Sequence, residues 1–463
     1  MENLPILNFA ETMAALPPSP SPEGLDKAIK EAREQYDFII VLDDDPTGTQ
    51  TVYDVPVITN RSGIKKEIEC GTPLFFLLTN SRAYSRQVAE FTAAQIGTEL
   101  RSHASGKRYL VIFRGDSTLR GHFPYEEEHF SITAGKSAVP HWIIPAFFEG
   151  GRYTFNDVHY VREGDQLIPA AQTPFAQDAA FGYENSDLKE WVAEKGNNGR
   201  SRKGYAATSI SLAELRDENL GKLKQRTKEE LWGPIIVAVN AVDYTDLKRA
   251  ALVILKNNRS PIIRSAASFI KALLGQPDRP LLKLKRKAKH GGLIVVGSHV
   301  PKTTAQLAHL RSNTDLSEYV VDVRSLLFEK PAIASRDLAQ KISKAMREGQ
   351  DVLLYTSREV ITTEGADANL DIAARVSAYL EETVAALTIQ PSFLLTKGGI
   401  TSSRIATEAL GVKRAMVLGQ VQAGVPTWEL GPESKFPGMP FIIYPGNVGG
   451  EDGLTSVLEN TIV

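Results

Sequence analysis

Short apolar runs without polar alternation recur along the chain, and segments with helical periodicity lie between them. Such runs are typical of strands that are buried on both faces of a parallel sheet. Strands that alternate with helices predict a doubly wound α/β fold with mainly parallel sheets. In the first half of the chain, the runs lie at 37–43, 55–59, 73–79 and 109–113, and a long helix is expected at 85–102.

The same alternation begins again near residue 291, after a strongly basic, Pro/Gly-flanked stretch that is typical of a solvated linker. A chain of 463 residues is too long for one hydrophobic core. We therefore expect two doubly wound α/β domains that face a central cleft. The predicted parts are an N-terminal extension at 1–36, a first α/β domain at 37–275, a basic linker at 276–290 and a second α/β domain at 291–463.

Two local signals refine this outline. The extension contains a Pro/Ser-rich stretch at 16–24, which breaks regular structure, and then a short amphipathic helix at 25–36. It could pack on the body of the protein or on a neighbouring subunit, so a homodimer is a possible assembly. Farther along, Ser211 and Glu214 have the spacing of a capping box and predict a helix that begins there.

Composition narrows the class of protein. The formal net charge is −2, and the basic stretch has no interleaved aromatic residues, so we expect no nucleic-acid partner. The single cysteine, Cys70, excludes an internal disulfide and a cysteine-built metal site. No segment has the length and apolar character of a membrane span or a secretory signal. We expect a cytoplasmic protein without a membrane partner.

Three consecutive carboxylates, Asp43, Asp44 and Asp45, stand at the end of the first apolar run. Aspartate disfavours strand and helix interiors, and turns are its usual place. The carboxyl ends of parallel strands are also where α/β sheets bind their ligands. Carboxylates at this edge can accept hydrogen bonds from substrate hydroxyls, remove a proton or hold Mg²⁺.

The next strand ends in the first half carry more groups of the same kind. Arginine forms forked hydrogen bonds with carboxylates and phosphates, and Asp, Ser and Asn bind hydroxyls. Together these groups fit a small polyhydroxylated acid. The substrate-binding set predicted at these strand ends is Asp44, Asp45, Arg82, Asp116, Ser117, Arg120 and Arg152.

Glycine-rich loops follow three apolar runs in the second half. Glycines before a helix allow the backbone to approach a phosphate at the helix N-terminus. Three such loops indicate a nucleotide, although none has the Walker A or G-x-G-x-x-G spacing. No Cys/His cluster indicates a metal site of its own. The predicted nucleotide-binding set is Ser298, Gly398, Gly399, Ile400, Thr401, Gly446, Asn447 and Gly449.

Taken together, these patterns indicate a transfer enzyme with a sugar-acid domain and a nucleotide domain. The sequence resembles the four-carbon acid sugar kinases, formerly a domain of unknown function, from about residue 38 to 455. The resemblance rests on Asp44-Asp45-Pro46-Thr47-Gly48, on Asp116-Ser117-Thr118, on the Pro-Ala-Phe segment at 145–147, and on "GGITS" and "GNVGGEDGL" in the second half. The chain departs from the family's pattern at Tyr444-Pro445, where Lys-Ser is expected.

The resemblance implies ATP-dependent phosphorylation of the 4-hydroxyl of a tetronate, and overall similarity favours D-threonate. It implies ATP and Mg²⁺ as cofactors, with Mg²⁺ bound between phosphate oxygens and partly by water. Our hypothesis for the roles is that Asp116 or Asp45 is the general base and that Asp44 orients hydroxyls. Arg82 and Arg120 then hold the carboxylate or stabilise the transferring phosphoryl group.

Two other functions fit parts of the pattern. Asp43, Asp45 and Thr47 have the spacing of the haloacid-dehalogenase phosphatase signature, with Thr79 as its second motif. That interpretation finds no downstream lysine and paired aspartates for Mg²⁺ and gives the glycine loops no role. A non-catalytic sugar-acid or nucleotide sensor on the same scaffold is the other alternative, and ligand binding without turnover would favour it.

Overall fold

The computed structural model describes residues 4–197, 206–231, 233–257, 259–286, 289–298, 300–327, 331–358, 366–446 and 448–461. The chain divides into two compact units. The first contains residues up to Thr51 and Asn60–Asp278, and the second contains Val52–Thr59 and Arg279–Val463. The boundaries expected from the sequence near 36, 275 and 290 stay predictions.

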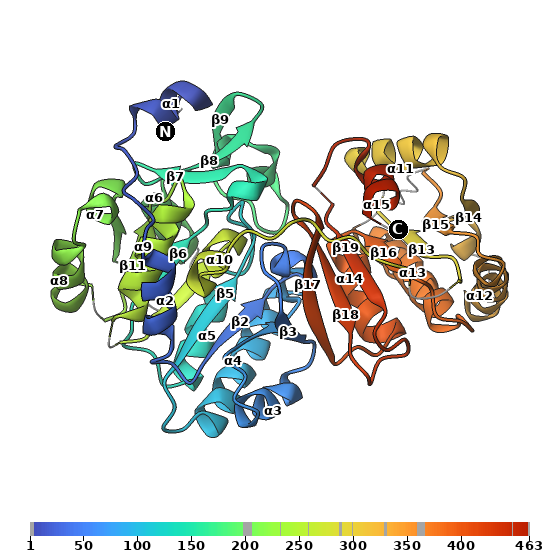
Figure 1. The fold of residues 1–463 in the computed structure, drawn as a ribbon, viewed down its shortest axis with the longest axis horizontal. Helices are drawn as coiled ribbons and strands as arrows, with labels where there is room; N and C mark the ends of the chain where they lie inside the picture. The colour runs from blue at the N-terminus through green and yellow to red at the C-terminus, as the bar shows by residue number, and fades with distance from the viewer. Residues whose placement is uncertain are drawn as a thin grey trace. The chain divides into compact units, whose positions relative to one another are not determined.

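The first unit is built on a parallel sheet whose central strands are buried along their whole length. Burial of both faces requires helices on each side, which is why these strands are continuous apolar runs. The helices form two packed groups, α3–α4–α5 and α2–α9–α10 (Figure 1). In spatial order the strands are β10 (Ala207–Ile210), β11 (Ile236–Val239), β6 (His141–Ile144), β12 (Ile262–Ser265), β5 (Tyr109–Arg114), β2 (Phe38–Asp43) and β4 (Leu74–Leu78). The helices are α2 (Leu25–Arg33), α3 (Ile64–Glu69), α4 (Arg86–His103), α5 (Tyr125–Thr133), α6 (Leu188–Asn197), α7 (Leu212–Arg216), α8 (Gly221–Glu229), α9 (Tyr244–Leu255) and α10 (Ala267–Leu274).

A small antiparallel sheet, which the sequence analysis did not predict, is attached to the first unit. Its strands run in the order β1 (Leu7–Asn8), β9 (Gln166–Pro169), β8 (Val158–Glu163) and β7 (Arg152–Phe155). The extension therefore packs on its own chain, through β1 and through α1 (Phe9–Ala15), whose Phe9 stacks obliquely on Tyr153 at 5.4 Å. The expected helix at 25–36 is α2, and the Ser211–Glu214 capping box is present at α7.

The second unit also has a parallel sheet covered by helices, with an antiparallel part that the sequence did not predict. The order of its strands is β3 (Val55–Ile58), β17 (Arg414–Gln422), β18 (Val425–Leu430), β19 (Pro440–Tyr444), β16 (Leu394–Lys397), β13 (Leu293–Val296), β15 (Val352–Thr356) and β14 (Ser317–Val321). Its helices are α11 (Pro301–Asn313), α12 (Pro331–Arg347), α13 (Ala366–Ala385), α14 (Gly399–Arg404) and α15 (Gly453–Thr461).

Two segments depart from their expected surroundings. β3 lies early in the sequence and was expected in a parallel sheet, but it pairs antiparallel with β17 in the second unit. The basic stretch contacts the second unit: Leu282 N–H donates to the Gln420 carbonyl at 2.7 Å, and Arg286 pairs with Asp351 at 2.6 Å. The predicted α/β class with mainly parallel strands and two domains is confirmed, whereas the central cleft stays a prediction. Within the described residues, no helix has the length and apolar character to cross a membrane.

Candidate active site

The acidic motif begins where β2 ends. Asp43 is the last residue of the strand, and its side chain is 1% exposed. A Cβ on Gly48 would lie 2.0 Å from Asp43 Oδ1, so only glycine allows the loop to close over this carboxylate. Asp45 caps the short 3₁₀ helix Pro46–Thr49 by accepting from Thr47 N–H at 2.8 Å. The Asp-Asp-Pro-Thr-Gly sequence is thus a folded loop that holds its carboxylates in fixed positions.

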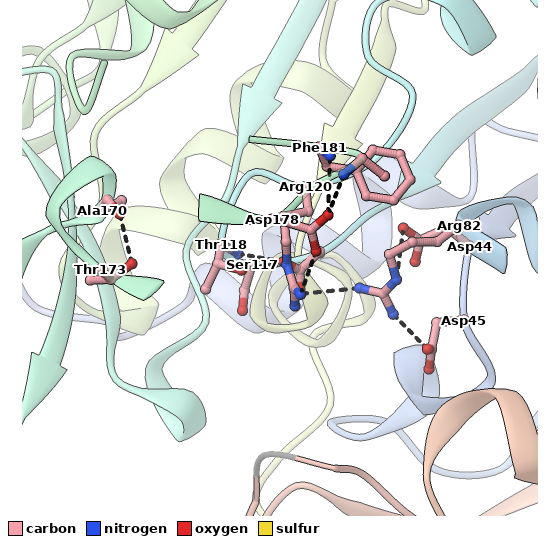
Figure 2. Close-up of polar contacts among 12 residues, drawn as sticks. Asp44, Asp45, Arg82, Ser117, Thr118, Arg120, Ala170, Thr173, Asp178 and Phe181 are labelled. Atoms are coloured by element: carbon pink, nitrogen blue, oxygen red, sulfur yellow. Dashed lines mark hydrogen bonds and ion pairs between the residues drawn. The ribbon is translucent and has the colours of Figure 1, made fainter. Parts of the chain in front are cut away.

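Arg82 connects the carboxylates of two strand ends. It follows β4 and approaches Asp45 Oδ2 at 2.6 Å, Asp116 Oδ1 at 3.1 Å and Asp44 Oδ2 at 3.9 Å. Figure 2 shows its guanidinium pointing toward Asp44 and Asp45. The predicted grouping of these four residues at one edge of the sheet is therefore present in the structure.

Asp116 lies in the loop after β5 and is held by a second arginine. Arg120 Nε donates to Asp116 Oδ2 at 2.8 Å. Arg120 also approaches Asp178 at 3.4 Å, and both of these residues are labelled in Figure 2. The Thr118 hydroxyl and backbone N–H also donate to Asp116 Oδ2. Ser117 belongs to the same loop, and its carbonyl accepts from His159 Nε2 at 2.8 Å.

Arg152, at the start of β7, reaches this group through an aromatic ring. Its guanidinium lies 5.5 Å from the centroid of Phe175, and that of Arg120 lies 5.3 Å from the same centroid. Cations over a ring face are attracted by its quadrupole, so Phe175 can hold both arginines near each other. The predicted substrate set therefore forms one neighbourhood, although the role of each member stays a prediction.

Three charged residues that support this neighbourhood were missed by the sequence analysis. Arg114 approaches Asp43 at 3.4 Å and Asp44 at 3.3 Å, and Arg264 forms a buried pair with Glu127 at 2.7 Å. A Cβ on Gly121 would lie 2.6 Å from Arg264 Nη2, so the 116–121 loop rests directly on this arginine. A charge inside the apolar strand "PIIRS" was the signal available for Arg264.

The carboxylates differ in their affinity for protons. Burial raises the pKa of Asp43 well above its usual range and also raises the pKa of Asp44, although arginines oppose the shift. For Asp45, burial is outweighed by Arg82 and Arg114, which hold its pKa below the usual range. Arg120 and Arg82 likewise lower the pKa of Asp116 against the effect of burial. Asp45 and Asp116 are therefore stable anions at neutral pH.

The predicted nucleotide loops lie at the carboxyl ends of β13, β16 and β19 in the second unit. A Cβ on Gly398 would lie 3.7 Å from Thr401 Oγ1 and 3.9 Å from Ser298 Cβ, so these three residues are close neighbours. Gly399 and Ile400 form the first turn of α14, where Ile400 is 56% exposed.

The third glycine loop is packed on the side chain of Tyr444. A Cβ on Gly449 would lie 2.2 Å from the Tyr444 hydroxyl, so a larger residue would displace the loop or the ring. Gly446 begins this loop, and its carbonyl lies 3.3 Å from Lys397 Nζ. Asn447, also in the predicted set, lies outside the described residues.

No group of three or more His, Cys, Asp or Glu residues in the described ranges could hold a metal ion. The site carboxylates of the first unit are instead close to arginines.

Comparisons with known proteins agree with a sugar-binding domain in the first half of the chain and a nucleotide-binding domain in the second half. Residues 39–273 match the model of a sugar-binding N-terminal domain, and residues 293–454 match that of a nucleotide-binding C-terminal domain. Among curated proteins, no relative matches the sequence. The chain belongs to the four-carbon acid sugar kinase family. This pair of domains is that of a kinase-type enzyme that binds a sugar and a nucleotide.

Solved structures of other proteins share the fold, and two of them illustrate the match. A protein of Salmonella typhimurium LT2, named as a candidate tRNA synthase, is 17% identical with a TM-score of 0.66, and the match covers 92% of this chain and 99% of that one. Haemophilus influenzae protein HI1011, of the DUF1537 family, is 15% identical with a TM-score of 0.59, and the match covers 91% and 100%. At these identities the similarity concerns the fold alone.

Proposed function

We propose that the protein transfers the γ-phosphoryl group of ATP to the 4-hydroxyl of a four-carbon sugar acid, with D-threonate as the substrate. The observation that carries this proposal is the group formed by Asp44, Asp45, Arg82, Asp116 and Arg120. It combines anions that accept hydroxyl protons with arginines that bind a carboxylate. The glycine loops of the second unit supply amide groups suited to the nucleotide phosphates.

In this mechanism the substrate carboxylate activates the general base. Asp116, or Asp45 as the alternative, is a weak base while two cations hold it as an anion. A substrate carboxylate that binds Arg82 or Arg120 competes for these cations and so raises the basicity of the aspartate beside it. Asp44 Oδ2 is buried and has no hydrogen-bond donor among the described residues, so the same competition for Arg82, which lies 3.9 Å away, would free it to accept and orient a substrate hydroxyl. When bound, Mg²⁺ would neutralise charge on the transferring group, and the residues that would hold it are those that bind the nucleotide phosphates, in the loops after β13, β16 and β19.

The phosphatase alternative requires Asp43 to attack a phosphorus atom. Asp43 is 1% exposed, lies under Gly48 and is directed at Arg114, so its carboxylate is not presented to a substrate. A measurement of turnover distinguishes the kinase from the sensor, because a sensor would bind its ligand without converting it. A cytoplasmic location, a homodimer and the absence of a nucleic-acid partner stay predictions attached to this proposal.

The position of phosphorylation tests the proposal. Incubation with Mg·ATP and D-threonate, followed by NMR of the product, is expected to show a phosphate ester on C4. The matched control is the 4-deoxy analogue, which keeps the carboxylate but lacks the accepting hydroxyl and should stay unmodified. An ester on another carbon, or ATP hydrolysis that is equal with both compounds, would contradict the proposed reaction.

A further inference from the structure

Lys397 is a fully buried lysine at the carboxyl end of β16. Its side chain is 0% exposed, and its amine donates to the Pro445 carbonyl at 2.6 Å and to the Gly446 carbonyl at 3.3 Å. It pairs in register with Tyr444 of β19, and the amine lies 4.3 Å from the centroid of the Tyr444 ring. Lys397 therefore connects the end of β16, which precedes the Gly398–Gly399 loop, to Pro445 and Gly446 at the start of the loop after β19.

These contacts determine how the start of the glycine loop is oriented. The two ends of a trans peptide group, its C=O and its N–H, point in opposite directions. Because the Pro445 carbonyl is directed at Lys397, the N–H of Gly446 points away from the amine. Tyr444 fixes the later part of the loop, because its hydroxyl would lie 2.2 Å from a Cβ on either Gly449 or Gly453.

Among the described residues, the charge of Lys397 has no anionic partner. In the part of the chain that the structure describes, no carboxylate lies within ion-pair distance of its amine, whereas Arg82, Arg120 and Arg264 in the first unit all have one. An ammonium group buried without an anion is costly. Burial, with a smaller effect from Lys302, lowers the pKa of Lys397 to about 7.

A second cation occupies the neighbouring strand ends. Arg358 donates to the Ser298 carbonyl at 2.6 Å and to the Thr356 carbonyl at 2.9 Å, so it joins the ends of β13 and β15. Like Lys397, it has no carboxylate partner among the described residues. Two cations held by carbonyl oxygens thus contact the loops that carry the predicted phosphate-binding residues Ser298 and Gly446.

We propose that Lys397 is a positioning residue for the nucleotide phosphates. Its protonated amine holds the Gly446 loop in the binding orientation, and its charge offsets that of the phosphates. Nucleotide binding is then strongest when Lys397 is protonated. This inference rests on the proposed function, because it requires that a nucleotide binds the second unit.

The other titratable groups around Lys397 would not produce the same pH dependence of nucleotide binding. Burial raises the pKa of Tyr444 to about 12, so the phenol stays neutral over the relevant range. On α14, which packs on this strand, Arg404 pairs with Glu381 of α13 at 3.0 Å. Lys302 of α11 carries the same charge as Lys397 and adds to the lowering of the pKa of Lys397 by burial. Asp452 adds to the raising of the pKa of Tyr444 by burial.

Calorimetric titration of the full chain with Mg·ADP, from about pH 6 to about pH 9, tests the inference. We expect the affinity of the unmodified protein to fall about tenfold over this range, which corresponds to a rise of about one unit in the pKa of Lys397 on binding. Lys397→Met should bind about tenfold more weakly at the acidic end and should lose the difference between the two ends. Comparison of the two proteins removes the titration of the nucleotide itself.

Lys435→Met is the matched control. Lys435 also donates its amine to a backbone carbonyl, that of Ala385, but it lies outside the glycine loops. This variant should retain the affinity and pH profile of the unmodified protein. Equal pH profiles for the unmodified protein and Lys397→Met would overturn the inference and leave the kinase proposal intact. Failure of the unmodified protein to bind Mg·ADP at any pH would overturn both.

Discussion

At the scale of single residues, the candidate site combines fixed anions with fixed cations. Asp116 is held between Arg82 and Arg120, at 3.1 and 2.8 Å, and its neighbours keep it anionic. Asp116→Asn should therefore lower turnover about 10²- to 10⁴-fold, the usual contribution of a general base. Nucleotide affinity, measured by calorimetry, should stay unchanged. Near-normal turnover would remove Asp116 from the mechanism, and Asp37→Asn, at an exposed ion pair with Lys107, is the control.

Gly48 offers a second test at this scale, of stability rather than chemistry. A methyl group here would lie 2.0 Å from Asp43 Oδ1, inside a buried and tightly packed loop. Gly48→Ala should lower the free energy of unfolding by about 1–3 kcal/mol, as overpacking commonly does. Gly221→Ala, at the start of α8 where no atom lies within 4 Å of the added Cβ, should not lower it. Denaturant melts of both variants measure the difference.

At the scale of elements, the small antiparallel sheet of the first unit supports the 116–121 loop through one histidine. His159 of β8 is 0% exposed, accepts from the Thr154 hydroxyl at 2.9 Å and donates to the Ser117 carbonyl at 2.8 Å. Burial lowers its pKa to about 4, so the neutral ring is the folded form.

The pH dependence of stability follows from this shift. The unfolded chain binds a proton at His159 below about pH 6.5, whereas the folded protein does not until about pH 4. The free energy of unfolding should therefore fall as the pH is lowered through this interval. His159→Gln should show a shallower fall in denaturant melts, and His103→Gln, at an exposed position, should follow the unmodified protein. Parallel curves for His159→Gln and the unmodified protein would contradict this role.

Local patterns predicted much of the fold at this scale, and long-range contacts account for the rest. The apolar runs at 37–43, 73–79 and 109–113 became β2, β4 and β5, and the helix expected at 85–102 appears as α4. The pairing of β3 with β17 joins residues far apart in the sequence, so no local pattern indicates it. The partners of Arg264 and Lys397 also come from distant segments, so the contacts of both were missed, although a charge inside an apolar strand was visible for Arg264.

At the scale of the whole molecule, each unit presents the groups suited to one reactant. The first has carboxylates and arginines at the ends of β2, β4 and β5, and the second has glycine loops at the ends of β13, β16 and β19. Phosphoryl transfer requires both sets and a divalent cation. Chelation of Mg²⁺ should therefore abolish turnover and leave the fold intact, as judged by circular dichroism, and added Mg²⁺ should restore turnover.

The most direct test of the central claim is coupled ADP release from Mg·ATP with a panel of four-carbon acids. The panel contains D- and L-threonate, D- and L-erythronate and their 3-oxo relatives, with p-nitrophenyl phosphate hydrolysis measured in parallel. The account predicts turnover with a tetronate, D-threonate foremost, and no hydrolysis of the aryl phosphate. No ADP release with any of the acids, together with hydrolysis of p-nitrophenyl phosphate, would contradict the account and favour the phosphatase.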